Sequence, residues 1–141
     1  MKPVLIQFPP NWGLPNASPF CMKLETWLRL ADVSYSVEEQ ANPQQAPNGK
    51  LPTLRYQGQV LADSNLIIQR LREDFEVTLD DWLTSEQRAT AHAIERMCEN
   101  SLYWGMLYSR WVDKRNWPNV RKTFFASLPP GLDRAAAAIV K

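Results

Sequence analysis

One stretch decides the fold of this chain, Asn16-Ala17-Ser18-Pro19-Phe20-Cys21-Met22-Lys23, where a predicted strand and loop lead into a helix. Ser18 is a favourable N-cap, because its side-chain oxygen can accept a hydrogen bond from an unpaired amide of the first turn, and Pro19 suits the first helical position. Such a helix start presents free N–H groups and the positive end of the helix dipole, and both stabilise an anion such as a thiolate. Ser18 and Cys21 together therefore indicate a candidate thiol site.

The elements around this stretch follow a β-α-β pattern. Residues 4–8 form a β-branched and aromatic run closed by Pro9-Pro10, which predicts a strand buried on both faces. The helix that starts at Ser18 has apolar side chains at helical spacing, and residues 34–38 alternate polar and apolar, as a half-exposed strand does. Two strands joined by a helix are expected to be parallel.

A hairpin and a second helix complete the first half of the chain. A proline-containing loop over residues 40–50 precedes two predicted antiparallel strands, 51–56 and 59–62, which are joined by a tight polar turn. A second amphipathic helix follows Asp63 and Ser64, which are cap-type residues. We expect its core-facing side chains to be Leu66, Ile67, Leu71 and Phe75.

The second half of the chain is predicted to be helical. A linker over residues 77–83 precedes Thr84-Ser85-Glu86-Gln87, which has the capping-box pattern that opens a helix. Apolar residues then recur near helical spacing, without proline, to about residue 112. Pro118 can begin a short helix through residue 125, and Pro129-Pro130-Gly131 leads to an alanine-rich final helix.

Length and composition allow one hydrophobic core, or one small domain with part of another. The chain has 141 residues, of which 45% are hydrophobic and 22% charged. The predicted elements divide the chain into a mixed domain over residues 1–77 and a helical domain over residues 78–141. The formal net charge of +1 gives no general attraction to nucleic acid or to an anionic membrane, so we expect neither as a partner.

Targeting and metal signals are not evident in the sequence. The first residues lack the pattern of a secretory signal, and no run of about 18 apolar residues occurs, so we expect a cytoplasmic protein without membrane insertion. The two cysteines, Cys21 and Cys98, lie in different predicted elements, which fits a reducing compartment without disulfides. Together with a single histidine, His92, they do not give metal-ligand spacing, and we expect no metal.

Three local motifs occur in order within residues 4–75. They are Ser18-Pro19-Phe20-Cys21-Met22-Lys23, then Pro47-Asn48-Gly49-Lys50-Leu51-Pro52-Thr53-Leu54, then Leu61-Ala62-Asp63-Ser64-Asn65-Leu66-Ile67. With the β-α-β, loop, β-β-α order, they resemble the glutathione transferase superfamily, whose N-terminal domain is thioredoxin-like. The resemblance implies an α+β or α/β fold in which this domain is followed by part of an all-α domain.

Within this superfamily, the sequence most resembles the metaxin and failed-axon-connections branch. This resemblance rests on the first helix, on Leu102-Tyr103-Trp104 and on Ser109-Arg110-Trp111-Val112-Asp113. Members of this branch need not be transferases. The resemblance therefore implies the fold more strongly than the chemistry.

For the thiol site, the resemblance implies two candidate catalytic residues. Ser18 occupies the N-cap position where a thiol oxidoreductase of this fold has its cysteine, and it would donate a hydrogen bond to a bound glutathione thiolate, as in serine-type transferases. Cys21 occupies the position of the second, usually buried cysteine. It is therefore either a small core residue or, if exposed, a thiol able to form a mixed disulfide with glutathione.

The resemblance also implies a glutathione-binding set, made up of Lys50, Leu51, Pro52, Asp63 and Ser64. If Pro52 is cis, the backbone of Leu51 can pair with the cysteinyl part of the tripeptide in strand-like fashion. Ser64 and the first-turn amides would hold a carboxylate, and Asp63 an ammonium group. The alternative is that Pro52 is a turn residue and that Asp63 and Ser64 are only caps.

Five aromatic residues follow in the helical half, and they have two interpretations. They either line an apolar pocket or form a core or interface, and they are Tyr103, Trp104, Tyr108, Trp111 and Trp117. Proteins of the superfamily complete this domain with several more helices, and without them an apolar face would be left uncovered. Because a large exposed apolar patch is unfavourable in a monomer, we expect self-association into a homo-oligomer through the aromatic face.

Three functions remain open from the sequence. The first is a glutathione transferase-like protein that binds glutathione as co-substrate and conjugates its thiolate to a small electrophile. The second is a non-catalytic, metaxin-like module for protein interaction. The third is a monothiol reductase that uses Cys21.

Overall fold

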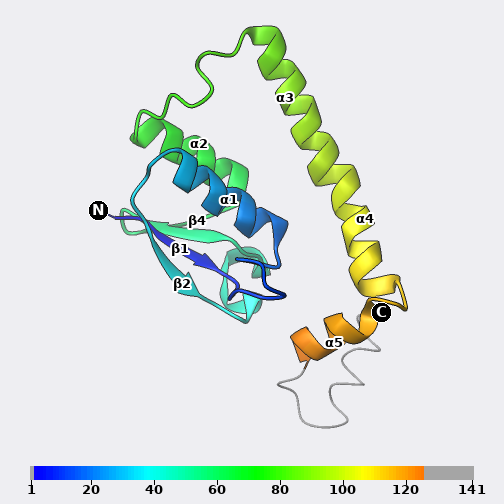
Figure 1. Cartoon of the computed structure of the whole chain (residues 1–141). Coiled ribbons are helices and arrows are strands. Elements are labelled where there is room, and N and C mark those ends of the chain that lie inside the picture. Colours follow the sequence, from blue (N-terminus) through cyan, green and yellow to red (C-terminus); the bar gives the residue numbers. More distant parts are fainter. Residues whose placement is uncertain (1, 126–141) are drawn as a thin grey trace. The chain divides into compact units, whose positions relative to one another are not determined.

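The computed structural model describes residues 2–125 (Figure 1). The chain divides into two compact units, with the boundary between Trp82 and Leu83. The alanine-rich helix expected after Pro129-Pro130-Gly131 lies outside the described residues.

The N-terminal unit combines a four-stranded mixed sheet with two helices. Its elements are β1 (Val4–Gln7), α1 (Pro19–Leu30), β2 (Ser36–Glu39), β3 (Thr53–Tyr56), β4 (Gln59–Ala62) and α2 (Ser64–Asp74). The strand order is β2-β1-β3-β4; β1 pairs with β2 in parallel, β1 with β3 antiparallel and β3 with β4 antiparallel. The predicted β-α-β, loop, β-β-α order is confirmed.

One face of this sheet carries the larger buried cluster, and a smaller cluster contains Ile6, Cys21, Ala46 and Leu51. α1 and α2 lie side by side over this face (Figure 1). The fully buried side chains between sheet and helices are Leu5, Leu24, Leu28, Leu54, Ile67 and Leu71. Burying each of these side chains stabilises the fold by about 1.5–3 kcal/mol before the loss of chain entropy is counted. The predicted apolar stripe of the first helix is thus the surface that docks it on the sheet.

The prediction for the second helix is wrong at Leu66. This side chain is 62% exposed, whereas Ile67 and Leu71 are fully buried. Successive residues of an α-helix are rotated by about 100°, so the stripe formed by Ile67 and Leu71 turns Leu66 toward solvent. Phe75 remains partly exposed, and its ring stacks on Tyr56 with a centroid separation of 5.9 Å.

β2 is more exposed than its alternation predicted. All four of its residues are exposed, because it is an edge strand and the core side chains of α1 pack on β1 and β3 instead. The loop that follows contains two single-turn 3-10 helices, Pro43–Gln45 and Pro47–Gly49, so proline shortens the helical segments there as predicted.

The second unit begins with a long helical segment. Its elements are α3 (Ser85–Met97), a π-helical turn (Cys98–Leu102), α4 (Tyr103–Leu107), a second π-helical turn (Tyr108–Val112) and α5 (Trp117–Phe125). Thr84 and Gln87 form the predicted capping box, because Thr84 Oγ1 accepts from the Gln87 N–H and Gln87 Oε1 accepts from the Thr84 N–H. The predicted helix to residue 112 is therefore continuous but contains two wider turns.

Aromatic rings pack where α5 follows the long segment. Trp111 lies 5.5 Å from Phe124 and 6.3 Å from Trp117, measured between ring centroids, and Trp117 also contacts Phe125. Among residues 2–125, none of the helices is both long and apolar enough to span a bilayer.

Candidate functional site

The sheet topology brings two of the three predicted motifs to one edge of the sheet, at the end where β3 begins. β1 and β4 both run antiparallel to β3, so their carboxyl ends lie at the same edge, where β3 begins. Ile6, Thr53 and Ala62 are successive partners across these three strands. The residues next in the chain, Pro52 before Thr53 and Asp63 after Ala62, are therefore close neighbours at this edge.

Both helices also begin at this edge, which brings the first motif to the other two. α1 follows β1 and α2 follows β4 along the chain. Lys23, in the second turn of α1, donates a hydrogen bond to Asn65 in the first turn of α2. The positive ends of two helix dipoles therefore lie near each other, which favours an anionic ligand.

Ser18 is the N-cap of α1, as predicted. Its backbone is extended, with φ −87° and ψ 124°, and its Oγ accepts a hydrogen bond from the Cys21 N–H at 3.4 Å. The side chain is half-buried, and Pro19 occupies the first helical turn. The hydroxyl is thus held at the helix start, where it can donate to an anion.

Asn16 supports Ser18 and was not identified from the sequence. Its side chain is 0% exposed; Nδ2 donates to the Phe8 carbonyl at 2.6 Å, and Oδ1 accepts from the Ser18 N–H at 2.9 Å. An Asn two residues before an N-cap Ser is a pattern that could have indicated this local turn. Its bond to Phe8 spans a loop and was not predictable from that pattern.

Cys21 is also 0% exposed. Burial raises the pKa of its thiol above the ordinary value, the hydrogen bonds with Ser18 and the Phe8 backbone act in the opposite direction, and the charge of Glu25 adds to the rise. The thiol therefore stays protonated at neutral pH. Its environment favours packing over attack on a substrate.

The second motif lies at the start of β3. The Leu51–Pro52 peptide bond is cis, as the resemblance implied. Leu51 and Pro52 are buried, and Lys50 is exposed. Within residues 2–125, the backbone N–H and C=O of Leu51 have no hydrogen-bond partner. An extended peptide could pair with these two groups, as a strand pairs with a sheet edge.

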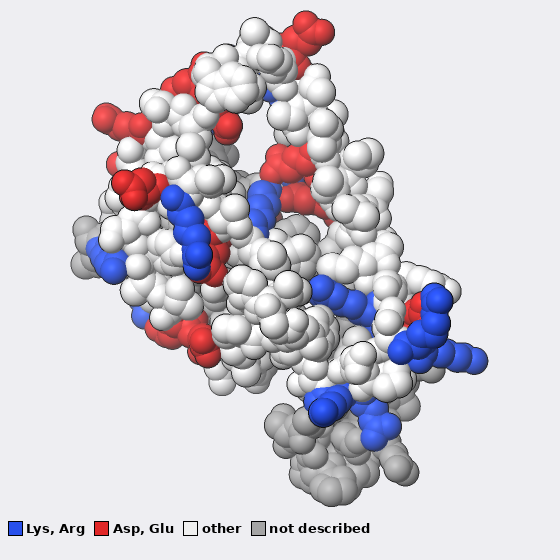
Figure 2. Space-filling view, viewed as in Figure 1, with Lys and Arg blue, Asp and Glu red and all other residues white. Residues whose placement is uncertain are grey.

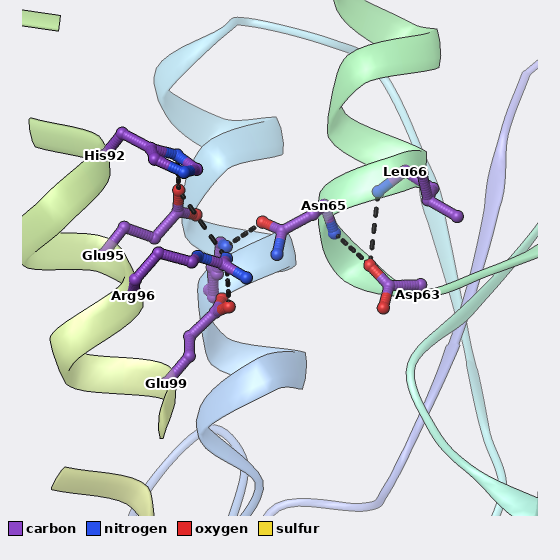
Figure 3. Close-up of polar contacts among 8 residues, drawn as sticks. Asp63, Asn65, Leu66, His92, Glu95, Arg96 and Glu99 are labelled. Atoms are coloured by element: carbon purple, nitrogen blue, oxygen red, sulfur yellow. Dashed lines mark hydrogen bonds and ion pairs between the residues drawn. The ribbon is translucent and has the colours of Figure 1, made fainter. Parts of the chain in front are cut away.

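The third motif opens α2. Asp63 is the N-cap, and its Oδ1 accepts from the Asn65 N–H at 2.8 Å and the Leu66 N–H at 3.3 Å (Figure 3). Both cap bonds use one oxygen, so Oδ2 is available within the described residues to meet an ammonium group. Ser64 is buried and is the first residue of the helix, where it is near the unpaired amides of that turn.

Asp63 also has an unusual backbone conformation. Its φ of 73° with ψ of 120° lies where residues other than glycine are rarely found. Holding such a conformation costs about 1–3 kcal/mol, and residues of this kind cluster at ligand-binding sites. The two cap hydrogen bonds stabilise it here.

A buried carboxylate near the same edge was not predicted. Glu25 Oε2 accepts from Gln7 Nε2 at 2.7 Å, and Oε1 accepts from Arg29 at 2.7 Å and from the Tyr35 hydroxyl at 3.1 Å. Burial acts to raise the pKa of Glu25, but these three hydrogen bonds outweigh it, and the pKa lies below its ordinary value of 4.5. The Glu25 and Arg29 pair, four residues apart, was the available sequence signal.

The other candidates of the sequence lie in the second unit. His92 is exposed and its Nδ1 is 3.9 Å from Glu95 Oε2, while Arg96 pairs with Glu99 along the same helix (Figure 3). Cys98 is an exposed free thiol. These groups form a polar helix surface rather than a catalytic cluster.

The site thus combines a hydroxyl at one helix start, an unpaired backbone edge and an acidic cap at a second helix start. Residues 19–116 match the family model of the glutathione S-transferase N-terminal domain. This chain belongs to that family. Among solved structures, glutathione transferase Omega 2S from Trametes versicolor aligns with a TM-score of 0.60 at 17% identity, over 92% of this chain and 61% of that chain, and so supports the fold.

Of three curated relatives of this glutathione S-transferase family member, one is named as a transferase and two are not. The chain is 40% identical over 106 residues to failed axon connections of Drosophila melanogaster, covering 75% of this chain and 25% of that protein. It is 30% identical over 121 residues to metaxin-1 of Sus scrofa, covering 85% and 38%. It is 35% identical over 113 residues to an isoprene-epoxide–glutathione S-transferase of Rhodococcus sp. strain AD45, covering 77% and 48%. The chain therefore spans less than half the length of each of these relatives.

Proposed function

We propose that this protein binds glutathione at the sheet edge and that Ser18 stabilises its thiolate for attack on a small electrophile. The observation that carries the proposal is the convergence of Ser18, the backbone of Leu51 and the pair Asp63-Ser64 at one edge. Each feature alone is common, but their combination matches the three chemical parts of the tripeptide.

Each part of glutathione has a complementary group at this edge. The cysteinyl backbone pairs with the N–H and C=O of Leu51. The amino-acid end places its carboxylate at Ser64 and the first-turn amides of α2, with its ammonium at Asp63 Oδ2. The exposed ammonium group of Lys50 is available for the remaining carboxylate.

The proposed chemistry depends on the Ser18 hydroxyl. A hydrogen bond from Ser18 to the sulfur favours the thiolate and lowers the thiol pKa of bound glutathione. The thiolate then forms a bond to carbon of the electrophile. With an epoxide, a carbon–oxygen bond breaks and the resulting alkoxide takes a proton from water. The similarity to a transferase named for isoprene epoxide supports a small epoxide as the substrate class.

Titration calorimetry with glutathione tests the proposal. We expect saturable binding, and we expect Ser64→Ala to weaken it by about tenfold to a hundredfold, because a hydrogen bond to a charged group is lost. Ser85→Ala is the matched control, since Ser85 is the first residue of α3 as Ser64 is of α2. Ser18→Ala is expected to lower kcat by about 10²–10³. The absence of binding at millimolar glutathione would contradict the proposal.

A non-catalytic interaction module is the second candidate. It is favoured by the similarity to metaxin-1 and to failed axon connections. An absence of glutathione binding in the calorimetric test would favour it. A monothiol reductase that uses Cys21 is the third candidate, and the burial and raised pKa of that thiol argue against it. Loss of thiol exchange in Cys21→Ser, with Ser18→Ala active, would support it.

We further propose that the protein self-associates in a reducing compartment such as the cytoplasm. Both cysteines are free thiols, which fits that compartment. The long helical segment exposes large apolar side chains, which are Ile94, Met97, Leu102, Trp104 and Tyr108. Such a surface favours pairing with a second copy. Sedimentation showing only monomer at all concentrations would contradict self-association.

A further inference from the structure

Four residues, Phe8, Asn16, Ser18 and Cys21, form a ring of polar contacts between the residue that follows β1 and the start of α1. Asn16 Nδ2 donates to the Phe8 carbonyl at 2.6 Å, and Asn16 Oδ1 accepts from the Ser18 N–H at 2.9 Å. Ser18 Oγ accepts from the Cys21 N–H at 3.4 Å. The Phe8 backbone acts to lower the pKa of the Cys21 thiol, so Phe8 and Cys21 are also neighbours, which completes the ring.

Asn16 is the buried member that links the strand to the cap. Its side chain is fully buried, and burying an amide is unfavourable unless its polar atoms are paired. Both polar atoms are paired, since Nδ2 donates to the Phe8 carbonyl and Oδ1 accepts from the Ser18 N–H. The backbone of Ser18 is therefore tied to the residue that follows β1, and its position does not depend on the helix alone.

The ring also restricts the Ser18 hydroxyl. Its oxygen accepts from the Cys21 N–H, so the hydroxyl hydrogen must be directed away from that amide. A hydroxyl whose oxygen is held in place before the ligand arrives stabilises a bound anion better than one that must first be ordered.

We propose that Asn16 is a positioning residue that fixes the Ser18 hydroxyl for a hydrogen bond to the sulfur of glutathione. The role rests on the proposed glutathione site. Asn16 acts through Ser18 and does not contact the ligand. Its removal is therefore expected to change the bound thiol in the same way as removal of the hydroxyl.

Asn16→Leu is the main variant, because leucine has a similar volume and makes no side-chain hydrogen bond. The thiolate absorbance of bound glutathione, followed against pH, gives the thiol pKa. We expect Asn16→Leu to raise it by about 1–2 pH units, as Ser18→Ala does, and the double variant to raise it no further. Gln7→Met is the matched control. Gln7 is the last residue of β1, and its buried side-chain amide donates to Glu25 of α1 and takes no part in the ring. This variant is expected to leave the thiol pKa unchanged.

Amide hydrogen exchange without glutathione tests the ring itself. The Ser18 N–H is expected to be protected in the parent and in Gln7→Met, and to lose its protection in Asn16→Leu. If Asn16→Leu does not fold, Asn16→Ala is measured in its place. The protection of the Ser18 amide in the parent then tests the positioning role of Asn16. An unprotected Ser18 amide in the parent overturns the role.

The outcomes separate this role from the proposed function. If the parent binds glutathione with a lowered thiol pKa and folded Asn16→Leu does the same, the positioning role alone is overturned. If the parent does not bind glutathione, the proposed function fails and the role fails with it. Additive effects of Asn16→Leu and Ser18→Ala on the thiol pKa also overturn it, because they show that Asn16 does not act through Ser18.

Discussion

The two units of this protein differ in where their apolar side chains lie. In the N-terminal unit, Leu24, Leu28 and Leu54 are fully buried between the sheet and its helices. In the described part of the second unit, Leu102 is 67% and Trp104 65% exposed, and Val120 is the only buried hydrophobic residue there. A sheet with two helices can bury its own apolar face, whereas within residues 83–125 the long helical segment and the short helix provide no second layer over the apolar stripe of that segment.

The two units also differ in how their charged side chains are exposed to solvent. Lys and Arg side chains gather where the long helical segment ends and over α5 (Figure 2). Asp113 pairs there with Arg115 at 2.7 Å on an exposed turn. In the N-terminal unit, by contrast, the carboxylate of Glu25 is buried and hydrogen-bonded. The units therefore differ in how strongly individual polar groups are coupled to folding.

The largest expected effect is a core truncation. Leu28→Ala is expected to lower the free energy of unfolding of the N-terminal unit by about 2–5 kcal/mol, because it leaves a cavity in that core. Leu102→Ala is the matched control, expected to change stability by less than about 0.5 kcal/mol in the monomer. Urea denaturation at low protein concentration measures both. Equal losses would show that the described second unit has a core of its own.

Helix caps come next in size. Asp63→Ala is expected to lower the free energy of unfolding by about 0.5–2 kcal/mol, because α2 loses both cap hydrogen bonds. Asp63→Asn keeps a capping oxygen and tolerates a positive φ, so it is expected to change stability little. Thr84→Ala is expected to increase amide exchange at the start of α3 without changing the urea midpoint of the N-terminal unit. If Thr84→Ala destabilised both units equally, the two units would not unfold independently, contrary to this expectation.

A smaller effect is expected from acid. The pKa of Glu25 is lower in the folded protein than its ordinary value of 4.5, so its contribution to stability is complete above that value and is lost as the pH falls through the folded pKa. We expect the urea midpoint of the N-terminal unit to fall as the pH is lowered below about 4.5, and Glu25→Gln to make this fall shallower. An identical pH profile for the two proteins would show that the buried network does not couple to folding.

The smallest effect is expected at Asp113. Hydrogen bonds from Arg115 lower the pKa of Asp113 to about 2; the Asp113 side chain is partly buried, but its partner Arg115 is exposed to solvent, which screens the pair. Exposed ion pairs contribute little to stability, so Asp113→Asn is expected to leave the urea midpoint unchanged at neutral pH. A large loss of stability would indicate that this turn is buried in solution, for example by a second copy.

Local signals predicted most of the element order. Ser18 before Pro19 indicated the start of α1, and Thr84 with Gln87 indicated the start of α3, because a cap depends on residues within one turn. Leu66 was assigned to the wrong face, because several helix faces were consistent with the spacing and only the packing of α2 on α1, β3 and β4 selected one. The wider turns that begin at Cys98 and Tyr108 had no signal in the apolar pattern.

The candidate site was predictable in part. Ser18, Pro52 and Asp63 were identified from three separated motifs, and strand pairing then brought them to one edge. Asn16 and Glu25 were missed, because a buried polar residue and an exposed one have the same appearance in a sequence. Their roles follow from bonds to Phe8, which follows β1, and to Gln7, the last residue of β1.

The sequence by itself determined where helices begin, where the hairpin turns and which residues are chemically able to handle a thiol. These features depend on backbone preferences and side chains within a few positions of one another. Only the tertiary structure decided that Cys21 is enclosed, that Asn16 ties Ser18 to β1 and that the backbone of Leu51 is left unpaired beside Asp63. Burial and convergence depend on segments far apart in the chain, so the physical reason is packing, which local sequence does not specify.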